Sequence, residues 1–164
     1  MKIEIFFDLS LNKNTENSLN QWKEIEIPKL IKTLSSIIKN PGFNEKKYNI
    51  VFIDDNEMKN LNYTYRKKNS TTDVLTFNYN DEITDNMTDS EIYISLEKAE
   101  KQAVEKKHTL ENELTVLLLH GLLHSIGYDH ERSKEDEKIM QTLEQQVLTL
   151  TGNENLKPLI SNEI

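Results

Sequence analysis

The segment at residues 109–127, TLENELTVLLLHGLLHSIG, constrains the fold more than any other part of the chain. It predicts one helix, with Thr109 as its N-terminal cap and Gly127 as the residue that ends it. Apolar side chains occupy almost every side of this helix: Leu117, Leu118, Leu119, Leu122, Leu123 and Ile126. A helix that is apolar all round is buried among other elements. The rest of the chain must therefore supply a shell around it.

The remaining hydrophobic patterns predict that shell. Patterns typical of strands cover residues 2–10, 46–55, 72–80 and 90–98. Further helical patterns cover residues 20–40, 56–68, 96–107 and 133–152. This order of elements predicts a single α+β domain, with a small mixed four-stranded sheet and about five helices. Because proline is tolerated in the first turn of a helix, we expect the first helix to begin near Pro28.

Length and composition narrow the class of protein. A chain of 164 residues suits one domain, which we expect at residues 1–152, followed by a poorly ordered tail at 153–164. The absence of cysteine excludes disulfides and a thiolate nucleophile. We find neither a signal peptide nor a membrane-spanning apolar run, so we expect a cytoplasmic protein without membrane contact. The net charge of −8 argues against a generic nucleic-acid binder but allows a local basic patch.

Three of the chain's four histidines lie within residues 120–130, HGLLHSIGYDH. His120 and His124 are four residues apart, a spacing that stacks two imidazoles on one helix face. Gly127 lets the chain turn back, so that His130 can reach the same point. Three imidazole nitrogens suit one zinc ion and leave a fourth position for water, whose pKa then falls toward ~7. Alternatively, these are buried imidazoles without a metal, and each then needs its own hydrogen-bond partner.

The residue after the first histidine bears on the kind of enzyme. In the HExxH motif of zinc peptidases, a glutamate at this position is the general base. Here the position is Gly121, so the helix keeps the HxxxH spacing of a zincin but lacks the peptidase base. The sequence therefore argues against a peptidase.

Two blocks of the chain carry a resemblance to a known family. Residues 120–130, HGLLHSIGYDH, are similar to the pattern HGxLHLxGYDH, and residues 61–77, LNYTYRKKNSTTDVLTF, are similar to LNxxYR…TDVLSF. A weaker match is the acidic stretch EDEKIMQTLE at 135–144. Together they resemble the YbeY family, the metal-dependent endoribonucleases and rRNA maturation factors of bacteria. The chain departs from the family pattern at Ser125, usually leucine, and at Thr76, usually serine.

The resemblance implies both a site and a function. It implies that His120, His124 and His130 hold one zinc ion per chain, and that Arg66 is the catalytic or substrate-binding arginine. The implied activity is cleavage of single-stranded RNA, in maturation of the 3′ end of the small-subunit rRNA and in ribosome quality control. The implied partners are rRNA and the ribosome or small-subunit proteins. The alternative is a ribosome-associated assembly factor whose zinc is structural and which has little catalytic activity of its own.

Arg66 also has a physical argument in its favour. A planar guanidinium binds two phosphate oxygens at once and offsets negative charge in a transition state. Arg66 begins RKK at 66–68, the only run of three basic residues in the chain. Without the resemblance, a solvated charged surface is the favoured interpretation of this run.

Several further residues are left with two interpretations each. Asp129 is either a carboxylate that orients His130 or a turn residue. Asp73 is either a catalytic group or a turn residue at the start of a strand. Three tyrosines either stack on RNA bases or pack on the protein: Tyr63, Tyr65 and Tyr79. His108, in the polar segment EKKHTL, is expected at the surface.

Overall fold

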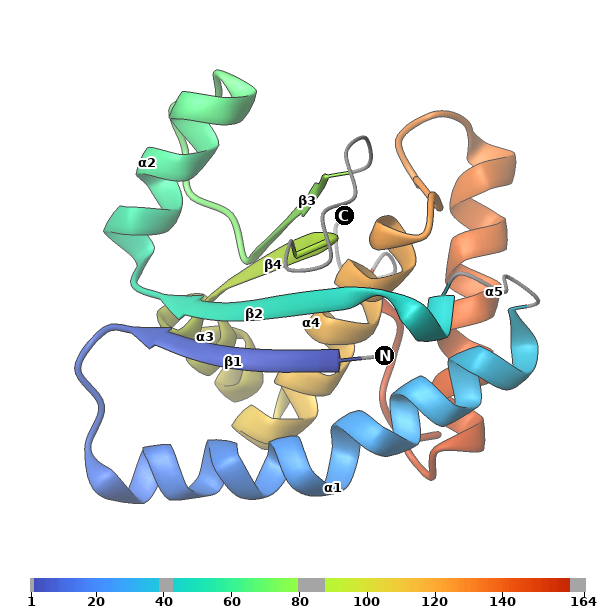
Figure 1. The fold of residues 1–164 in the computed structure, drawn as a ribbon, viewed down its shortest axis with the longest axis horizontal. Helices are drawn as coiled ribbons and strands as arrows, with labels where there is room; N and C mark the ends of the chain where they lie inside the picture. Colours follow the sequence, from blue (N-terminus) through green and yellow to red (C-terminus); the bar gives the residue numbers. More distant parts are fainter. Residues whose placement is uncertain (1, 39–42, 80–87, 160–164) are drawn as a thin grey trace.

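A computed structural model describes residues 2–38, 43–79 and 88–159 of the chain (Figure 1). Its strands are β1 (Lys2–Asp8), β2 (Lys47–Ile53), β3 (Val74–Asn78) and β4 (Ser90–Ser95). Its α-helices are α1 (Lys13–Ile37), α2 (Asp55–Arg66), α3 (Leu96–Lys106), α4 (Leu110–Ser125) and α5 (Lys134–Leu150). A short 3-10 helix, η1 (Phe43–Glu45), precedes β2. The described residues form a small α+β domain with five α-helices and four strands, which confirms the predicted fold class.

The four strands form one mixed sheet in the order β1-β2-β4-β3. β1 and β4 both run parallel to β2, whereas β3 runs antiparallel to β4. Parallel neighbours need a crossover connection, and α1 provides it between β1 and β2 (Figure 1). The antiparallel strand β3 lies at the edge of the sheet, where it contacts α4.

α4 is the central helix, as its apolar sequence predicts. It packs against β3 and β4, and also against α1, α3 and α5 (Figure 1). All its side chains from Leu114 to Leu123 are buried. The indole Nε1 of Trp22 on α1 donates a hydrogen bond of 3.0 Å to Oγ1 of Thr115, which joins these two helices. Although α4 is apolar on every side, neither it nor any other described helix is long and apolar enough to cross a membrane.

The start of α1 differs from the prediction. The helix begins at Lys13, and Pro28 lies inside it rather than in its first turn. Asn12 caps the N-terminus, because its side-chain oxygen accepts a backbone N–H at 2.8 Å. Leu19 and Trp22, which precede the proline, are buried in the core. This burial and the cap together offset the backbone hydrogen bond that a proline removes from a helix.

The two faces of the sheet are covered unequally. On one face, alternate strand residues such as Ile50 and Ile92 join the main core with α1 and α4. On the opposite, outer face, α2 covers one end of the sheet and forms a second, smaller core. The buried members of this core are Ile53, Met58 and Leu75. Phe77 and Tyr93 lie partly buried at its margin, so the outer face of β3 and β4 is only partly covered.

The segment after α5 packs onto the domain. The sequence predicts a poorly ordered tail at 153–164, yet Leu156 and Leu159 are buried in the main core. Removing these two apolar side chains from water is favourable, and this holds residues 153–159 against the domain. Residues 160–164 lie outside the described part of the chain, so the predicted domain limits stay a prediction.

Candidate metal centre and its cleft

The two helix-borne histidines lie side by side, as their spacing predicts. The imidazole rings of His120 and His124 are 4.7 Å apart, centroid to centroid. Their Nε2 atoms are 3.2 Å apart. His120 is buried and His124 is partly buried, at the end of α4. The pair therefore presents two nitrogens to one point.

A turn at Gly127 brings the third histidine to this pair. Gly127 has a φ of +102°, a left-handed conformation that favours glycine, and its N–H donates to the carbonyl of His124 at 3.1 Å. The ring of His130 then lies 5.1 Å from that of His120 and 5.3 Å from that of His124. One nitrogen from each of the three lies within 4.8 Å of the others, so the group could hold a metal ion.

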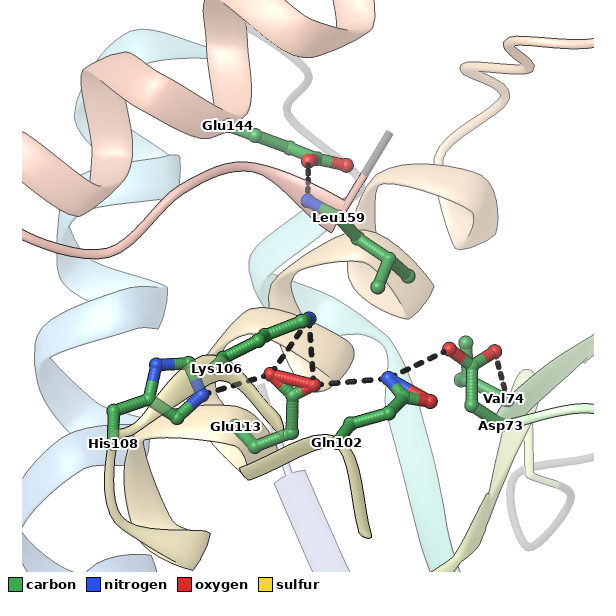
Figure 2. A network of polar contacts seen from close by, with 8 residues as sticks. All are labelled: Asp73, Val74, Gln102, Lys106, His108, Glu113, Glu144 and Leu159. Atoms are coloured by element: carbon green, nitrogen blue, oxygen red, sulfur yellow. Dashed lines mark hydrogen bonds and ion pairs between the residues drawn. The ribbon is translucent and has the colours of Figure 1, made fainter. Parts of the chain in front are cut away.

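A buried carboxylate that the sequence analysis missed orients the first histidine. Glu144 on α5 is 1% exposed, and its Oε1 lies 2.7 Å from Nδ1 of His120. Its Oε2 accepts the N–H of Leu159 at 3.0 Å (Figure 2). Because a carboxylate only accepts, Nδ1 of His120 carries the proton, and Nε2 offers its lone pair to a metal. Glu144 lies four residues from both Met140 and Leu148 on the buried face of α5. This spacing is the sequence signal that could have identified it as a buried carboxylate.

Burial keeps the second histidine neutral. Burial, together with the neighbouring His120 and His130, lowers the pKa of His124 from 6.5 to about 4. Neutral imidazole is the form that binds a metal, so no proton competes for this nitrogen near pH 7. Three imidazole nitrogens are a donor set that suits a transition-metal ion better than magnesium or calcium. The residues present therefore fit a metal of this kind.

We expect the metal-free protein to lose stability as the pH falls from 6.5 to about 4. In this range the unfolded chain binds a proton at His124 that the folded chain does not, so acid favours unfolding. Above pH 6.5 the residue is neutral in both states. Urea unfolding at about pH 7 and about pH 4.5 measures the effect. The His124→Leu variant should lose less stability between these two pH values than the unaltered chain, and an equal loss would contradict the shift.

Gly121 faces the sheet at a point of close approach. A Cβ atom at this position would lie 2.8 Å from Cγ2 of Ile92 on β4 and 3.3 Å from Oγ1 of Thr76 on β3. The hydroxyl of Thr76 also donates to the carbonyl of Gly121 at 3.3 Å. The glutamate of a zinc peptidase would therefore not fit here without displacing the side chain of Ile92. This close packing agrees with the sequence argument against a peptidase.

We expect Gly121→Ala to destabilise the fold by about 1–2 kcal/mol, because the new methyl group overpacks the contact with Ile92. Helix propensity alone predicts the opposite, a gain of about 1 kcal/mol for alanine over glycine. Urea unfolding of the two proteins measures the difference in free energy. A more stable Gly121→Ala protein would show that the sheet does not approach α4 so closely.

Arg66 lies across a cleft from the histidines. It is the last residue of α2, and its Nη2 is 3.7 Å from Oε1 of Glu131, the residue after His130. Arg66 and all three histidines line the same cleft, which has a volume of about 860 Å³. The side chains of this ion pair are 36% and 60% exposed, so the pair is weak and an anion in the cleft can replace the glutamate. The fold thus brings together the four residues that the sequence singled out.

Asp129 and Asp73, for which the sequence left two interpretations each, lie in different surroundings. Oδ1 of Asp129 accepts the N–H of Glu131 at 2.9 Å, a turn contact that lowers the pKa of Asp129. Asp73 lines the cleft, and burial raises the pKa of its carboxyl group. Its Oδ1 accepts the N–H of Val74 at 2.8 Å, and its Oδ2 accepts from Nε2 of Gln102 at 3.3 Å. Asp73 therefore both binds the first backbone N–H of β3 and forms part of the cleft wall.

Behind Asp73, a buried polar network joins α3 to α4 (Figure 2). Gln102 donates from Nε2 to Oε2 of Glu113 at 2.9 Å, and Glu113 is 0% exposed. Lys106 donates to both oxygens of Glu113, at 2.9 and 2.8 Å. Nε2 of His108 lies 3.0 Å from Oε1 of the same carboxylate. The prediction of a surface position for His108 is wrong, because its side chain is 16% exposed and covers this network.

A buried HxxxH helix and a third histidine behind a glycine turn, in an α+β domain, define a protein with a candidate three-histidine metal site that lacks the peptidase glutamate. The sequence profile of the family described as Endoribonuclease YbeY matches residues 12–152. The chain belongs to this family, which confirms the resemblance found in the sequence.

Individual relatives support the same assignment. Endoribonuclease YbeY of Aquifex aeolicus is 34% identical over 148 residues, which cover 90% of this chain and 91% of the relative. Endoribonuclease YbeY of Thermodesulfovibrio yellowstonii is 43% identical over 129 residues, which cover 77% of each chain. Among solved structures, a Thermotoga maritima protein determined in solution matches with a TM-score of 0.56 and 28% identity, over 98% of this chain and 93% of that one.

Proposed function

We propose that this chain is a zinc-dependent endoribonuclease that cleaves single-stranded RNA. The observation that carries the proposal is a cleft lined by three imidazoles, with nitrogens within 4.8 Å of one another, and by two arginines, Arg66 and Arg132. The description of the family, Endoribonuclease YbeY, supports the reaction class. The proposed substrate is rRNA, at the 3′ end of the small-subunit RNA. The proposed setting is cytoplasmic, with ribosome quality control as a second role and the ribosome or small-subunit proteins as partners.

Four residues of the cleft, and Glu144 behind it, have roles in this proposal. His120, His124 and His130 hold one zinc ion, and Glu144 orients the first of them. When bound there, a zinc ion would act as a Lewis acid and would lower the pKa of a bound water molecule toward ~7. Arg66 binds two non-bridging oxygens of the scissile phosphate and offsets the negative charge that grows in the transition state.

Cleavage of end-labelled single-stranded RNA by the zinc-loaded chain tests the proposal. We expect Arg66→Glu to keep about one zinc ion per chain but to cleave at least about 100-fold more slowly, because the phosphate loses its cation. His124→Ala should lose both zinc and cleavage. Lys59→Glu is the matched control, since it makes the same kind of charge reversal at an exposed position of α2 and should cleave normally.

Three results would count against parts of the proposal. Normal cleavage by zinc-loaded Arg66→Glu would exclude the role of Arg66. Clearly less than one zinc ion per chain, with all three histidines intact, would exclude the metal site. A zinc-loaded chain that binds ribosomal small subunits but cleaves no RNA would favour the assembly factor over the nuclease.

A further inference from the structure

The outer face of β3 and β4 carries a cluster of aromatic rings beside the cleft. We call it the aromatic surface, and its members are Tyr65, Phe77, Tyr79 and Tyr93. Tyr65 on α2 contacts Phe77 on β3 edge to face, with ring centroids 5.1 Å apart. Phe77 contacts Tyr93 on β4 in the same way at 5.6 Å. Three consecutive elements of the chain, α2, β3 and β4, thus contribute to one aromatic surface.

Two of these rings are more exposed than packing alone requires. Tyr65 is 64% exposed and Tyr79 is 47% exposed. An aromatic side chain that served only to complete the small core under α2 would be buried, because its large apolar area gains most from leaving water. Tyr65 instead contacts the ring of Phe77 edge to face and stays largely exposed. The surface therefore offers aromatic area to a flat partner.

A run of cations adjoins the aromatic surface, which suits a ligand that carries both negative charges and uncharged planar rings. Arg66, Lys67 and Lys68 follow Tyr65 directly in the chain. The carboxylate of Glu91, the residue paired with Phe77 on β4, lies among these rings and accepts a hydrogen bond from the hydroxyl of Tyr79 at 2.7 Å. Single-stranded nucleic acid matches this arrangement, since its bases stack on aromatic rings while its phosphates need nearby cations.

The aromatic surface is continuous with the cleft. Phe77 and Arg66 both line the cleft that contains the three histidines. Tyr65 precedes Arg66 in the chain and contacts Phe77, so it lies at the edge of this cleft. A strand stacked on Tyr65 can therefore continue directly to the metal centre.

We propose that the aromatic surface stacks the bases of the single-stranded RNA whose backbone enters the histidine cleft, with Tyr65 as its principal ring. This inference rests on the proposed nuclease function and adds the surface that selects unpaired RNA. In a duplex the base faces are already stacked on their neighbours, so a paired strand has none to offer. Unpaired bases are free to stack, and this preference does not depend on their sequence.

Titration with single-stranded RNA tests the role of Tyr65. The probe is a fluorescent twelve-nucleotide oligoadenylate that carries one 2-aminopurine, titrated on ice with the full chain, with its length checked on a gel afterwards. We expect Tyr65→Ala to bind it about tenfold more weakly and to lose the quenching of 2-aminopurine that stacking causes. Tyr65→Phe should retain both, because the ring is kept. Tyr63→Ala is the matched control, since Tyr63 is a 58% exposed tyrosine on the same helix and is not a member of the aromatic surface.

The outcomes separate this inference from the nuclease function. If Tyr65→Ala binds and quenches as Tyr63→Ala does, the aromatic surface is wrong, even when the chain cleaves RNA. If Tyr65→Phe is as weak as Tyr65→Ala, the ring does not stack and the inference is also wrong. If binding and quenching depend on Tyr65 but the zinc-loaded chain cleaves no RNA, the surface stands and the nuclease function fails.

Discussion

Zinc is expected to bind about 10- to 100-fold more weakly when Glu144 is replaced by glutamine. Two donors converge on this buried carboxylate, Nδ1 of His120 at 2.7 Å and the N–H of Leu159 at 3.0 Å. Glutamine keeps one acceptor oxygen and places an NH₂ group against the other donor. The His120 ring then loses the partner that fixes its tautomer, or the backbone of Leu159 is left with a buried, unsatisfied N–H.

Competition with a coloured zinc chelator measures this loss of affinity, and circular dichroism shows whether the variant is folded. Glu135→Gln is the matched control, because it makes the same change at an exposed position of α5 and should bind zinc normally. A folded Glu144→Gln protein with unchanged zinc affinity would show that the carboxylate does not position the ligand.

The second large effect is expected at Lys106, whose replacement by methionine should cost about 3 kcal/mol of unfolding free energy. Glu113 is 0% exposed, and Lys106 is the cation nearest to it, with contacts of 2.9 and 2.8 Å. Methionine keeps the length of the side chain but removes the charge, which leaves a buried carboxylate held only by Gln102 and His108. The cost is that of an uncompensated buried charge rather than of a lost surface ion pair.

Urea unfolding measures this free energy, with Lys101→Met as the control. Lys101 is an exposed lysine on the same helix, so the control reports what the loss of one positive charge does on its own. If both variants lose the same small amount, the contacts of Lys106 contribute no more than those of an exposed pair. If only Lys106→Met is strongly destabilised, the network in Figure 2 holds α3 against α4.

Features set by one continuous stretch of sequence were predictable. The burial of α4 followed from apolar residues on all its sides, since such a helix has no face to give to water. The meeting of His120, His124 and His130 followed from helix geometry and a glycine turn. The mixed sheet followed from the order of strands and helices, and the structure confirms it.

Features that depend on contacts between distant segments were not predictable in this way. Glu144 lies 24 residues after His120, and only the packing of α5 on α4 brings its carboxylate to the ring. The start of α1 was placed too late because the sequence rule for Pro28 takes no account of the buried Leu19 and Trp22 before it. The position of Arg66 beside Glu131 likewise depends on how α2 and the turn that follows Gly127 are placed around β3.

The bond between Leu159 and Glu144 has a practical consequence for anyone who handles this protein. Residue 159 is linked to His120, a candidate metal ligand, through a single side chain, Glu144. Motion of a purification tag or fused domain attached shortly after residue 159 would strain the hydrogen bond between Leu159 and Glu144. The edge strand β1 is distant in sequence from the histidines. A fusion before β1 therefore avoids this mechanical coupling.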